Sequence, residues 1–539
     1  MTDDWYKHAV FYELYPRAFC DSNGDGKGDF QGILSKVDYL AELGVDCVWL
    51  LPYYPSPLFD DGYDIADYYH IHPDFGSVED LKRLIDALHE RGIHVIADLV
   101  MNHTSDQHPW FVESRSSLDN PKRDWYVWSD TKDRYQDVRI IFIDTEESNW
   151  AYDESTGQYY WHRFYSQQPD LNFDNPEVQQ EMLKIMDFWL ELGLDGFRAD
   201  AVPYLFEREN TICENLPETH DFLKEIRRHM NTKWHGKVLL AEANQWPEET
   251  REYFGDGDEF HMGFHFPIMP RLFMSLKKAD RTSIVDIMER TPEIPHSCQW
   301  CVFLRNHDEL TLEMVTPEER DYMWEQYAPE DRMRLNLGIR RRLAPLLDND
   351  RRRIELMNAL LFSLPGSPII YYGDEIGMGD NIWLNDRDGV RIPMQWNSGH
   401  NAGFSDADPE KLKAPVIDDD RFSYQKVNVE AQRHDPDSLF NKIRHMIAVR
   451  RQHPVFGAGE FEFNLPDNKA VLAYWRAYQR EKVLVVVNLS DEEQTAVFRL
   501  GLFSGHEPVD LLSEQRLPEI VGRHYEIILQ PCAYFWLAV

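Results

Sequence analysis

The chain of 539 residues is too long for one compact core, and its content of 43% hydrophobic and 13% aromatic residues excludes an intrinsically disordered protein. Lys and Arg total 56 against 94 Asp and Glu, which gives a formal net charge of −38 at pH 7. Nucleic acids and anionic membranes bind cationic surfaces, so we expect neither as a partner. A neutral, hydroxyl-rich small molecule is compatible with this charge.

The N-terminal segment lacks the basic region and the apolar run of a signal peptide, and no run of eighteen apolar residues occurs. Six cysteines in so long a chain do not suggest a disulfide framework, which favours a reducing compartment and a cytoplasmic protein. Cys298 and Cys301 have CxxC spacing, but they directly precede a predicted strand. We therefore expect buried core thiols rather than a redox or zinc site. The oligomeric state stays open, a homo-oligomer included.

The first hundred residues alternate between strand and helix patterns. The predicted order is strand 9–15, helix 33–43, strand 45–51, helix 78–90 and strand 94–100. Such alternation is typical of folds built on a parallel sheet.

A loop between the first strand and the first helix places oxygen-bearing side chains at alternate positions. A glycine follows at the sixth position, and Gly32 stands where an EF-hand would have its glutamate. We expect a structural Ca²⁺ loop of another kind, although turn residues without an ion would give the same pattern. Its predicted ligands are Asp21, Asn23, Asp25, the carbonyl of Lys27, and Asp29.

After the third strand, strand periodicity stops until Gly196, which predicts an inserted subdomain over residues 104–170. Most of its aromatic residues are expected to form a small core rather than stack on a ligand. A helix at 178–192 follows. The remaining barrel strands are predicted at 196–200, 238–241, 259–266, 299–305 and 368–372.

The predicted fold class is α/β: a (β/α)8 TIM barrel with this subdomain and a C-terminal antiparallel β-sandwich. The barrel would occupy residues 1–103 and 171–454, with insertions near 309–353 and 374–438, and the sandwich 455–539.

Three predicted strands end in a carboxylate, namely Asp200, Glu242 and Asp308. The carboxyl ends of parallel barrel strands meet on one face, so we expect these groups to share one pocket. A pair of carboxylates can cleave a glycosidic bond, one as the nucleophile and the other as the general acid. The alternative is that each acid merely caps the next helix.

With these motifs laid out, the chain resembles the α-amylase superfamily, glycoside hydrolase family thirteen. The matching segments are 98–103, 168–172, 196–200 and 306–308, together with Glu242. The resemblance implies that Asp200 is the nucleophile, Glu242 the general acid/base and Asp308 the stabiliser of the transition state. It also implies that a group of side chains holds the −1 sugar: Asp60, Tyr63, His103, Gln167, Arg198, His307 and Arg391.

The resemblance further implies a second Ca²⁺ site and no organic cofactor. Its ligands would be Asn102, Asp170, Glu207 and the carbonyls of Tyr204 and Leu205, all of them oxygen donors.

Longer segments resemble the maltose-isomerising branch of the family, the trehalose synthases: 51–58, 103–110, 213–220, 242–247, 304–313 and 336–343. This implies interconversion of maltose and trehalose through a β-glucosyl intermediate on Asp200, with minor hydrolysis. We hypothesise that Asn244, Glu309 and Arg387 bind the +1 glucose or latch the site; exposed structural polar residues are the alternative. Three rival functions stay open. The first is a hydrolytic α-glucosidase such as oligo-1,6-glucosidase, the second a non-catalytic amylase-like protein, and the third, ranked lower, a sucrose isomerase.

Overall fold

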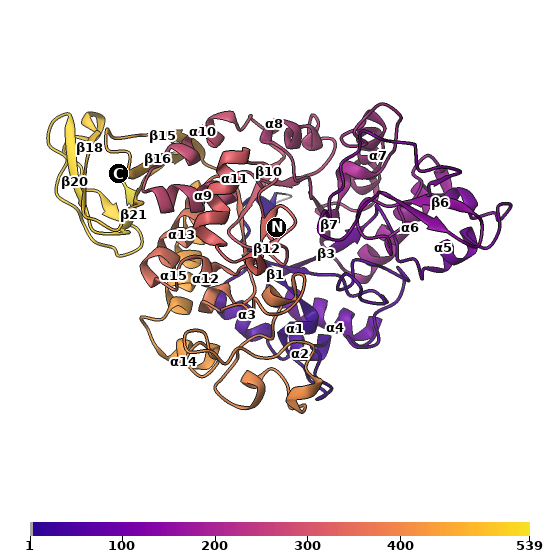
Figure 1. Ribbon diagram of the computed structural model, residues 1–539. Helices are drawn as coiled ribbons and strands as arrows, with labels where there is room; N and C mark the ends of the chain where they lie inside the picture. The colour runs from indigo at the N-terminus through magenta and orange to yellow at the C-terminus, as the bar shows by residue number, and fades with distance from the viewer. Residues whose placement is uncertain (1–3) are drawn as a thin grey trace.

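The computed structural model describes residues 4–539, and at its centre eight parallel strands close into a barrel (Figure 1). Around the barrel the strand order is β1-β14-β10-β9-β8-β7-β3-β2. The strands are β1 (Phe11–Leu14), β2 (Cys47–Leu50), β3 (His94–Val100), β7 (Gly196–Asp200), β8 (Val238–Ala241), β9 (Met262–Phe264), β10 (Gln299–Phe303) and β14 (Ser367–Tyr371). The predicted TIM barrel is confirmed.

Helices surround the barrel, as a βα repeat requires. They include α4 (Val78–His89), α6 (Pro176–Leu192), α7 (Pro217–Lys233), α9 (Ile268–Lys278), α10 (Thr282–Arg290), α13 (Arg351–Ser363) and α15 (Leu439–Gln452). The predicted helix at 33–43 is instead divided into α2 (Phe30–Leu34) and α3 (Val37–Leu43). The break is at Ser35, whose hydroxyl donates to the carbonyl of Gly32 at 2.6 Å. Local serine bonds of this kind compete with a continuous helix.

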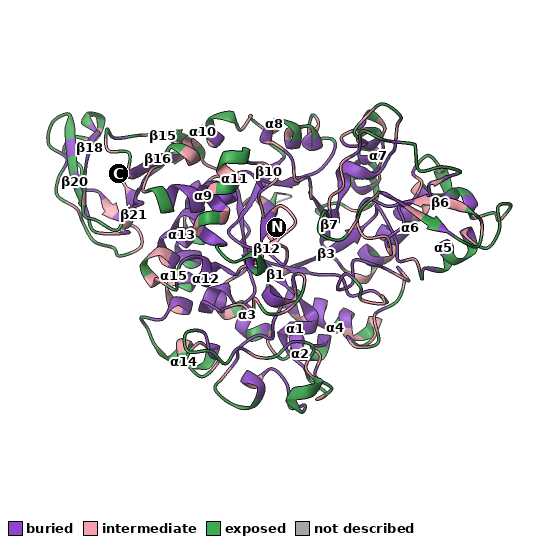
Figure 2. Cartoon of the chain, in the orientation of Figure 1, coloured by how far each residue is buried: buried purple, intermediate pink, exposed green. Residues whose placement is uncertain are grey.

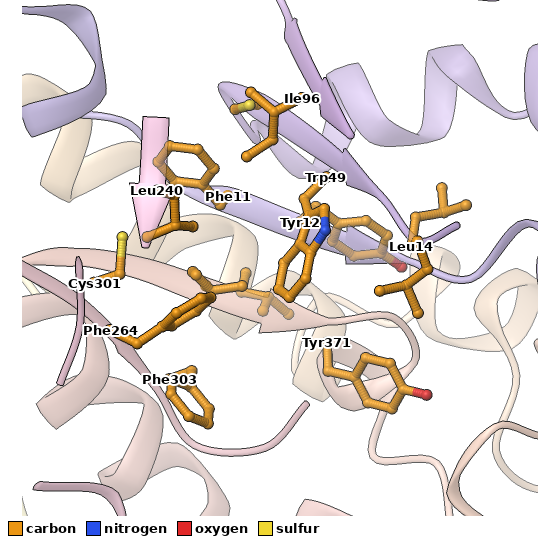
Figure 3. Close-up of a cluster of buried hydrophobic side chains, with 14 of the residues drawn as sticks. Phe11, Tyr12, Leu14, Trp49, Ile96, Leu240, Phe264, Cys301, Phe303 and Tyr371 are labelled. Atoms are coloured by element: carbon orange, nitrogen blue, oxygen red, sulfur yellow. The ribbon is translucent and has the colours of Figure 1, made fainter. Parts of the chain in front are cut away.

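Large apolar side chains fill the barrel, with Trp49, Phe264, Phe303 and Tyr371 among them (Figure 3). All six cysteines are free and buried, as expected for core thiols. Burial is greatest in the strands and on the inner helix faces, and the outer loops are exposed (Figure 2). Within residues 4–539, no helix is both long and apolar enough to cross a membrane.

The segment after β3 forms a separate lobe at the right of Figure 1. It contains α5 (Pro109–Ser114) and a small antiparallel sheet of β4 (Trp128–Ser129), β6 (Gln158–Trp161) and β5 (Trp150–Asp153). Trp150 and Trp161 pack in the core of this lobe. None of the tryptophans of the lobe lines the cavity described below, in keeping with the expected core role.

Two further insertions lie on the barrel. After β10 come α11 (Pro317–Tyr327) and a three-stranded sheet of β11 (Leu310–Thr311), β13 (Gly338–Ile339) and β12 (Arg334–Leu335). After β14, a long loop with α14 (Val429–His434) leads to α15.

The C-terminal domain consists of two antiparallel sheets that share one apolar core, so the predicted sandwich is confirmed. One sheet has the order β15-β16-β17-β21-β19 and the other pairs β18 with β20. The strands are β15 (Glu460–Phe463), β16 (Val471–Tyr478), β17 (Glu481–Asn488), β18 (Gln494–Arg499), β19 (Val509–Asp510), β20 (His524–Leu529) and β21 (Tyr534–Ala538).

Candidate active site

A cavity opens at the carboxyl ends of the barrel strands, the face where the active sites of such barrels lie. It brings together the three predicted catalytic acids and most of the predicted sugar-binding residues. The lining consists of Asp60, Tyr63, His103, Phe142, Phe164, Asp200, Glu242, Asn244, Phe266, Asn306, His307, Asp308, Glu309, Thr311, Glu313 and Arg387.

The guanidinium of Arg198 joins two of the catalytic acids. Its Nη1 lies 2.6 Å from Asp200 Oδ1, and its Nη2 lies 2.5 Å from Glu242 Oε1. Nη1 also contacts the buried Asp98, which accepts from Trp49 Nε1 at 2.8 Å. Arg198 is 1% exposed, so its charge acts on both acids with little screening by water.

The two acids differ in their affinity for a proton. Burial, together with Asp200 and Asp308, raises the pKa of Glu242 to about 8 against the attraction of Arg198. Burial raises the pKa of Asp200 to about 6, because desolvation outweighs Arg198. At pH 7 Glu242 is therefore mostly protonated and Asp200 mostly ionised, as an acid and a nucleophile must be.

Asp308 is held by two arginines of the loop after β14. Its Oδ1 lies 2.9 Å from Arg387 Nη1 and 3.0 Å from Arg391 Nη2. Arg387 also binds Asp60 at 2.5 Å, and Arg391 binds Asp61 at 2.9 Å. Although burial opposes its charge, His307, Arg387 and Arg391 hold the pKa of Asp308 below its usual range. Asp308 is therefore a fixed negative charge at physiological pH.

His307 links the sugar-binding side of the cavity to the barrel interior. Its Nε2 lies 2.8 Å from the Tyr63 hydroxyl and 3.1 Å from Asp308 Oδ2. On the other side, Nδ1 lies 2.5 Å from Oε1 of Glu13, a fully buried residue of β1. His103 is buried too, and its Nε2 has no protein partner, which leaves it free to bind a ligand.

Two family models match the chain. One, described as the alpha amylase catalytic domain, matches residues 13–329 and 331–459, and the other, described as the maltogenic amylase C-terminal domain, matches residues 461–536. The chain belongs to the α-amylase family. The fold, the placement of the three acids and the predicted resemblance to this family therefore agree.

Individual relatives locate the chain within the α-amylase family. The trehalose synthase/amylase of Mycobacterium tuberculosis is 57% identical over 99% of this chain and 90% of its own length. An oligo-1,6-glucosidase of Parageobacillus thermoglucosidasius is 34% identical over 92% of each chain. The solved structure of an isomaltulose synthase from Protaminobacter rubrum, 28% identical, covers both chains fully with a TM-score of 0.81. The predicted resemblance to the trehalose synthase branch is confirmed.

The glutamines at 167 and 168 occupy different places in this α-amylase family chain. Gln167 is not among the residues that line the cavity, and its carbonyl accepts from the backbone N–H of Asp106 at 2.8 Å. Gln168 is fully buried, and its Nε2 donates to Asp60 Oδ2 at 3.0 Å. Gln168 therefore contacts Asp60, a residue that lines the cavity, through its side chain, whereas the predicted sugar-binding role of Gln167 stays a prediction.

Asn244 and Glu309 line the cavity beyond the catalytic acids. Asn244 Nδ2 donates to Thr311 Oγ1 at 3.2 Å, and Asn336 Nδ2 donates to Glu309 Oε1 at 3.4 Å. Burial raises the pKa of Glu309 to about 7. Asn244 Oδ1 is buried without a partner, so it remains available to a ligand.

Sequence reasoning missed several lining residues of the α-amylase family site. Phe142 and Phe164 come from the inserted lobe, Phe266 follows β9, and Thr311 and Glu313 belong to the insertion after β10. Their positions follow loop geometry rather than a strand-end motif. Glu13 was missed as well, although a carboxylate inside an otherwise apolar strand was a visible signal.

The two predicted ion sites differ in whether their oxygen atoms already accept hydrogen bonds from the protein. In the 21–29 loop, Asp21 Oδ1 accepts from the N–H groups of Asn23 and Gly24, each at 2.9 Å. In the second set, Asn102 Oδ1, Asp170 Oδ2 and Glu207 Oε1 are all buried without a partner. Among residues 4–539, no three His, Cys, Asp or Glu side chains form a metal site by themselves. An ion would therefore also need amide or backbone oxygens.

Proposed function

We propose that this chain interconverts maltose and trehalose by intramolecular glucosyl transfer. One observation carries the proposal: Asp200 and Glu242 contact the same guanidinium in one buried cavity, with pKa values of about 6 and 8. Sharing one arginine keeps the two carboxyl groups close together, as a retaining double displacement requires. Similarity to trehalose synthases favours a sugar rather than water as the acceptor.

In the first half of the reaction, Asp200 attacks the anomeric carbon of the non-reducing glucose of maltose. The bond from that carbon to O4 of the second glucose breaks, and Glu242 gives its proton to O4. The products are a β-glucosyl ester on Asp200 and a free glucose. The fixed charge of Asp308 stabilises the oxocarbenium-like transition state.

In the second half, the released glucose turns within the cavity. Glu242, now ionised, takes the proton of the anomeric hydroxyl of the released glucose. This oxygen attacks the anomeric carbon of the glucosyl ester, the bond from that carbon to the carboxylate oxygen breaks, and Asp200 is released. Two inversions give net retention and an α,α-1,1 bond. Water that reaches the ester instead yields two glucose molecules, so minor hydrolysis accompanies the transfer.

Arg387 is suited to hold the site closed while the released glucose rotates, because it bridges Asp60 and Asp308 across the cavity. Asn244 and Glu309, which line the same cavity, offer hydrogen bonds to the +1 glucose. The face of Phe142, 5.4 Å from the Arg387 guanidinium, adds an apolar surface at the same place. We propose that these residues keep the released glucose, the acceptor of the second step, inside the cavity.

A structural Ca²⁺ is part of the proposal. The unpartnered oxygens of Asn102, Asp170 and Glu207 are the donor type that Ca²⁺ prefers, and the carbonyls of Tyr204 and Leu205 would complete the set. Asp21, Asn23, Asp25, Lys27 and Asp29 would hold a second ion. Such ions would stabilise the loops around the cavity and take no part in the bond changes.

The deciding experiment is incubation of the purified chain with maltose and, separately, with trehalose, with both sugars and glucose quantified over time. We expect each disaccharide to form from the other, with glucose as the minor product. Asp200→Asn is the matched inactive control. Glucose as the only product from both sugars would identify a hydrolytic α-glucosidase, the second candidate, which the 34% identity to an oligo-1,6-glucosidase supports.

A further inference from the structure

Three consecutive arginines, Arg340 to Arg342, connect the insertion after β10 to the loop after β14. They follow β13 directly and precede α12 (Leu343–Leu346). None of them lines the cavity. Their side chains nevertheless reach the segment that carries Arg387 and Arg391.

Arg340 binds the residues immediately before Arg387. Its Nη1 donates to the carbonyls of Leu384 and Asp386, each at 2.8 Å. Its Nε donates to the carbonyl of Arg332 at 2.6 Å, within its own insertion. One guanidinium thus joins the two segments through three main-chain acceptors.

Asp386 needs such support because its backbone is strained. Its φ of 44° lies in the left-handed region, which a non-glycine residue rarely adopts. Strained residues of this kind persist when the surrounding structure holds them in place. The bond from Arg340 to the Asp386 carbonyl is such a restraint, and it lies one residue before the arginine that bridges Asp60 and Asp308.

Arg341 and Arg342 hold the same loop at other points. Arg341 Nε lies 2.9 Å from Asp380 Oδ2, and the backbone N–H of Arg342 donates to that oxygen at 2.7 Å. Arg342 also donates to the carbonyls of Tyr372 at 2.8 Å and Val390 at 3.1 Å. The loop is therefore anchored at its start, near its middle and next to Arg391.

The same three residues also reach the end of β10. The carbonyl of Arg341 accepts from Arg305 Nε at 2.6 Å, and Arg305 Nη2 donates to the carbonyl of Asp308 at 2.5 Å. Both partners of the Arg387–Asp308 ion pair are thus tied, directly or through Arg305, to residues 340–342.

We propose that Arg340 is a positioning residue: it fixes the 384–386 segment so that Arg387 spans the cavity between Asp60 and Asp308. The effect of Arg340 on the products rests on the proposed function. In that reaction, a loosened Arg387 would let the released glucose leave and water enter. Arg340 itself touches neither substrate nor the reacting groups.

The test compares Arg340→Gln, the milder Arg340→Lys and a matched control, Arg334→Gln. Lysine keeps the charge, but one ammonium cannot reproduce the fork that reaches Leu384, Asp386 and Arg332. Arg334 belongs to the same insertion, yet its Nε donates to the carbonyl of Ala328 at 3.0 Å, away from the loop. The rate of amide hydrogen exchange in peptides spanning 380–391 measures how firmly Arg340 holds this segment, independently of catalytic activity.

We expect Arg340→Gln to raise amide exchange in 380–391 by about five- to tenfold, the scale of one lost hydrogen bond, and Arg340→Lys to give an intermediate value. In Arg340→Gln, the ratio of glucose to isomerised disaccharide should rise by a similar factor, and KM should change more than kcat. The control Arg334→Gln should match the parent chain in all three measurements. Unchanged exchange in Arg340→Gln and Arg340→Lys, or an equal increase in Arg334→Gln, would overturn the proposal. If the parent chain released only glucose, the proposed function would fail while the exchange data still decided the tether.

Discussion

Glu13 Oε1 lies 2.5 Å from Nδ1 of His307 inside the barrel, and it also accepts from the backbone N–H of His307 at 3.2 Å. Burial lowers the pKa of His307 well below its usual value, so the ring is neutral. Burial raises the pKa of Glu13 well above its usual value, so its carboxyl group is protonated. A neutral carboxyl group, which can donate as well as accept, therefore faces a neutral imidazole.

This arrangement predicts different outcomes for two substitutions of Glu13. Glu13→Gln still offers both a donor and an acceptor to His307 and should keep activity within about threefold, since a neutral hydrogen bond replaces another. Glu13→Leu leaves Nδ1 unpaired and should lower kcat/KM by about 10- to 100-fold, the equivalent of about 1–3 kcal/mol. Initial rates on maltose provide the measurement. Equal losses in both variants would mean that Glu13 acts as a charge rather than as a neutral hydrogen-bonding partner.

The pKa values of the catalytic pair predict a bell-shaped pH profile. Asp200 must be ionised, so activity should fall as the pH drops through about 6, and Glu242 must be protonated, so it should fall as the pH rises through about 8. The measurement is kcat/KM for maltose between pH 5 and about 9. A flat profile over this range would contradict the assignment. Glu242→Gln should lower activity at least about 100-fold, because it can neither give nor take the proton.

Removing Arg387 should change the product rather than abolish the chemistry. Arg387→Ala breaks the bridge between Asp60 and Asp308 while leaving Asp200 and Glu242 with Arg198. We expect the ratio of glucose to trehalose to rise about tenfold, an effect of about 1.4 kcal/mol on the partition. Trp383→Ala is the control, because Trp383 lies in the same loop and is 72% exposed. An unchanged ratio in Arg387→Ala would show that this residue does not retain the acceptor.

Chelation should destabilise the chain if the ion sites are filled. EDTA is expected to lower Tm by a few degrees, and excess Ca²⁺ to restore it, because an ion bound only to the folded state stabilises that state. Glu207→Gln and Asp21→Asn separate the two sites, since each should remove part of the response. A Tm that EDTA does not lower and that excess Ca²⁺ does not raise would argue against both sites.

The barrel strands and the meeting of Asp200, Glu242 and Asp308 in one cavity could be predicted from the sequence alone. A short apolar run followed at once by Asp200 or Glu242, or a few residues later by Asp308, carries both the strand and the carboxylate in one local pattern. Closure of a parallel barrel then places all such ends on one face, whatever the loops do. The same local logic located β3, β7 and β8 at their observed bounds.

Only the tertiary structure decided which further residues support the site. Glu13 lies within a strand, and its contact with His307 exists because the barrel closes between β1 and its neighbours. Two further contacts depend on how loops fold back over the strand ends. These are the hydrogen bond from Gln168, rather than Gln167, to Asp60, and the hydrogen bond from Arg340 to the carbonyl of Asp386. Loop paths follow long-range packing and single backbone angles, and neither leaves a period in the sequence. The helix division at Ser35, where the hydroxyl bonds to the carbonyl of Gly32, is a local feature, but it too leaves no period in the sequence.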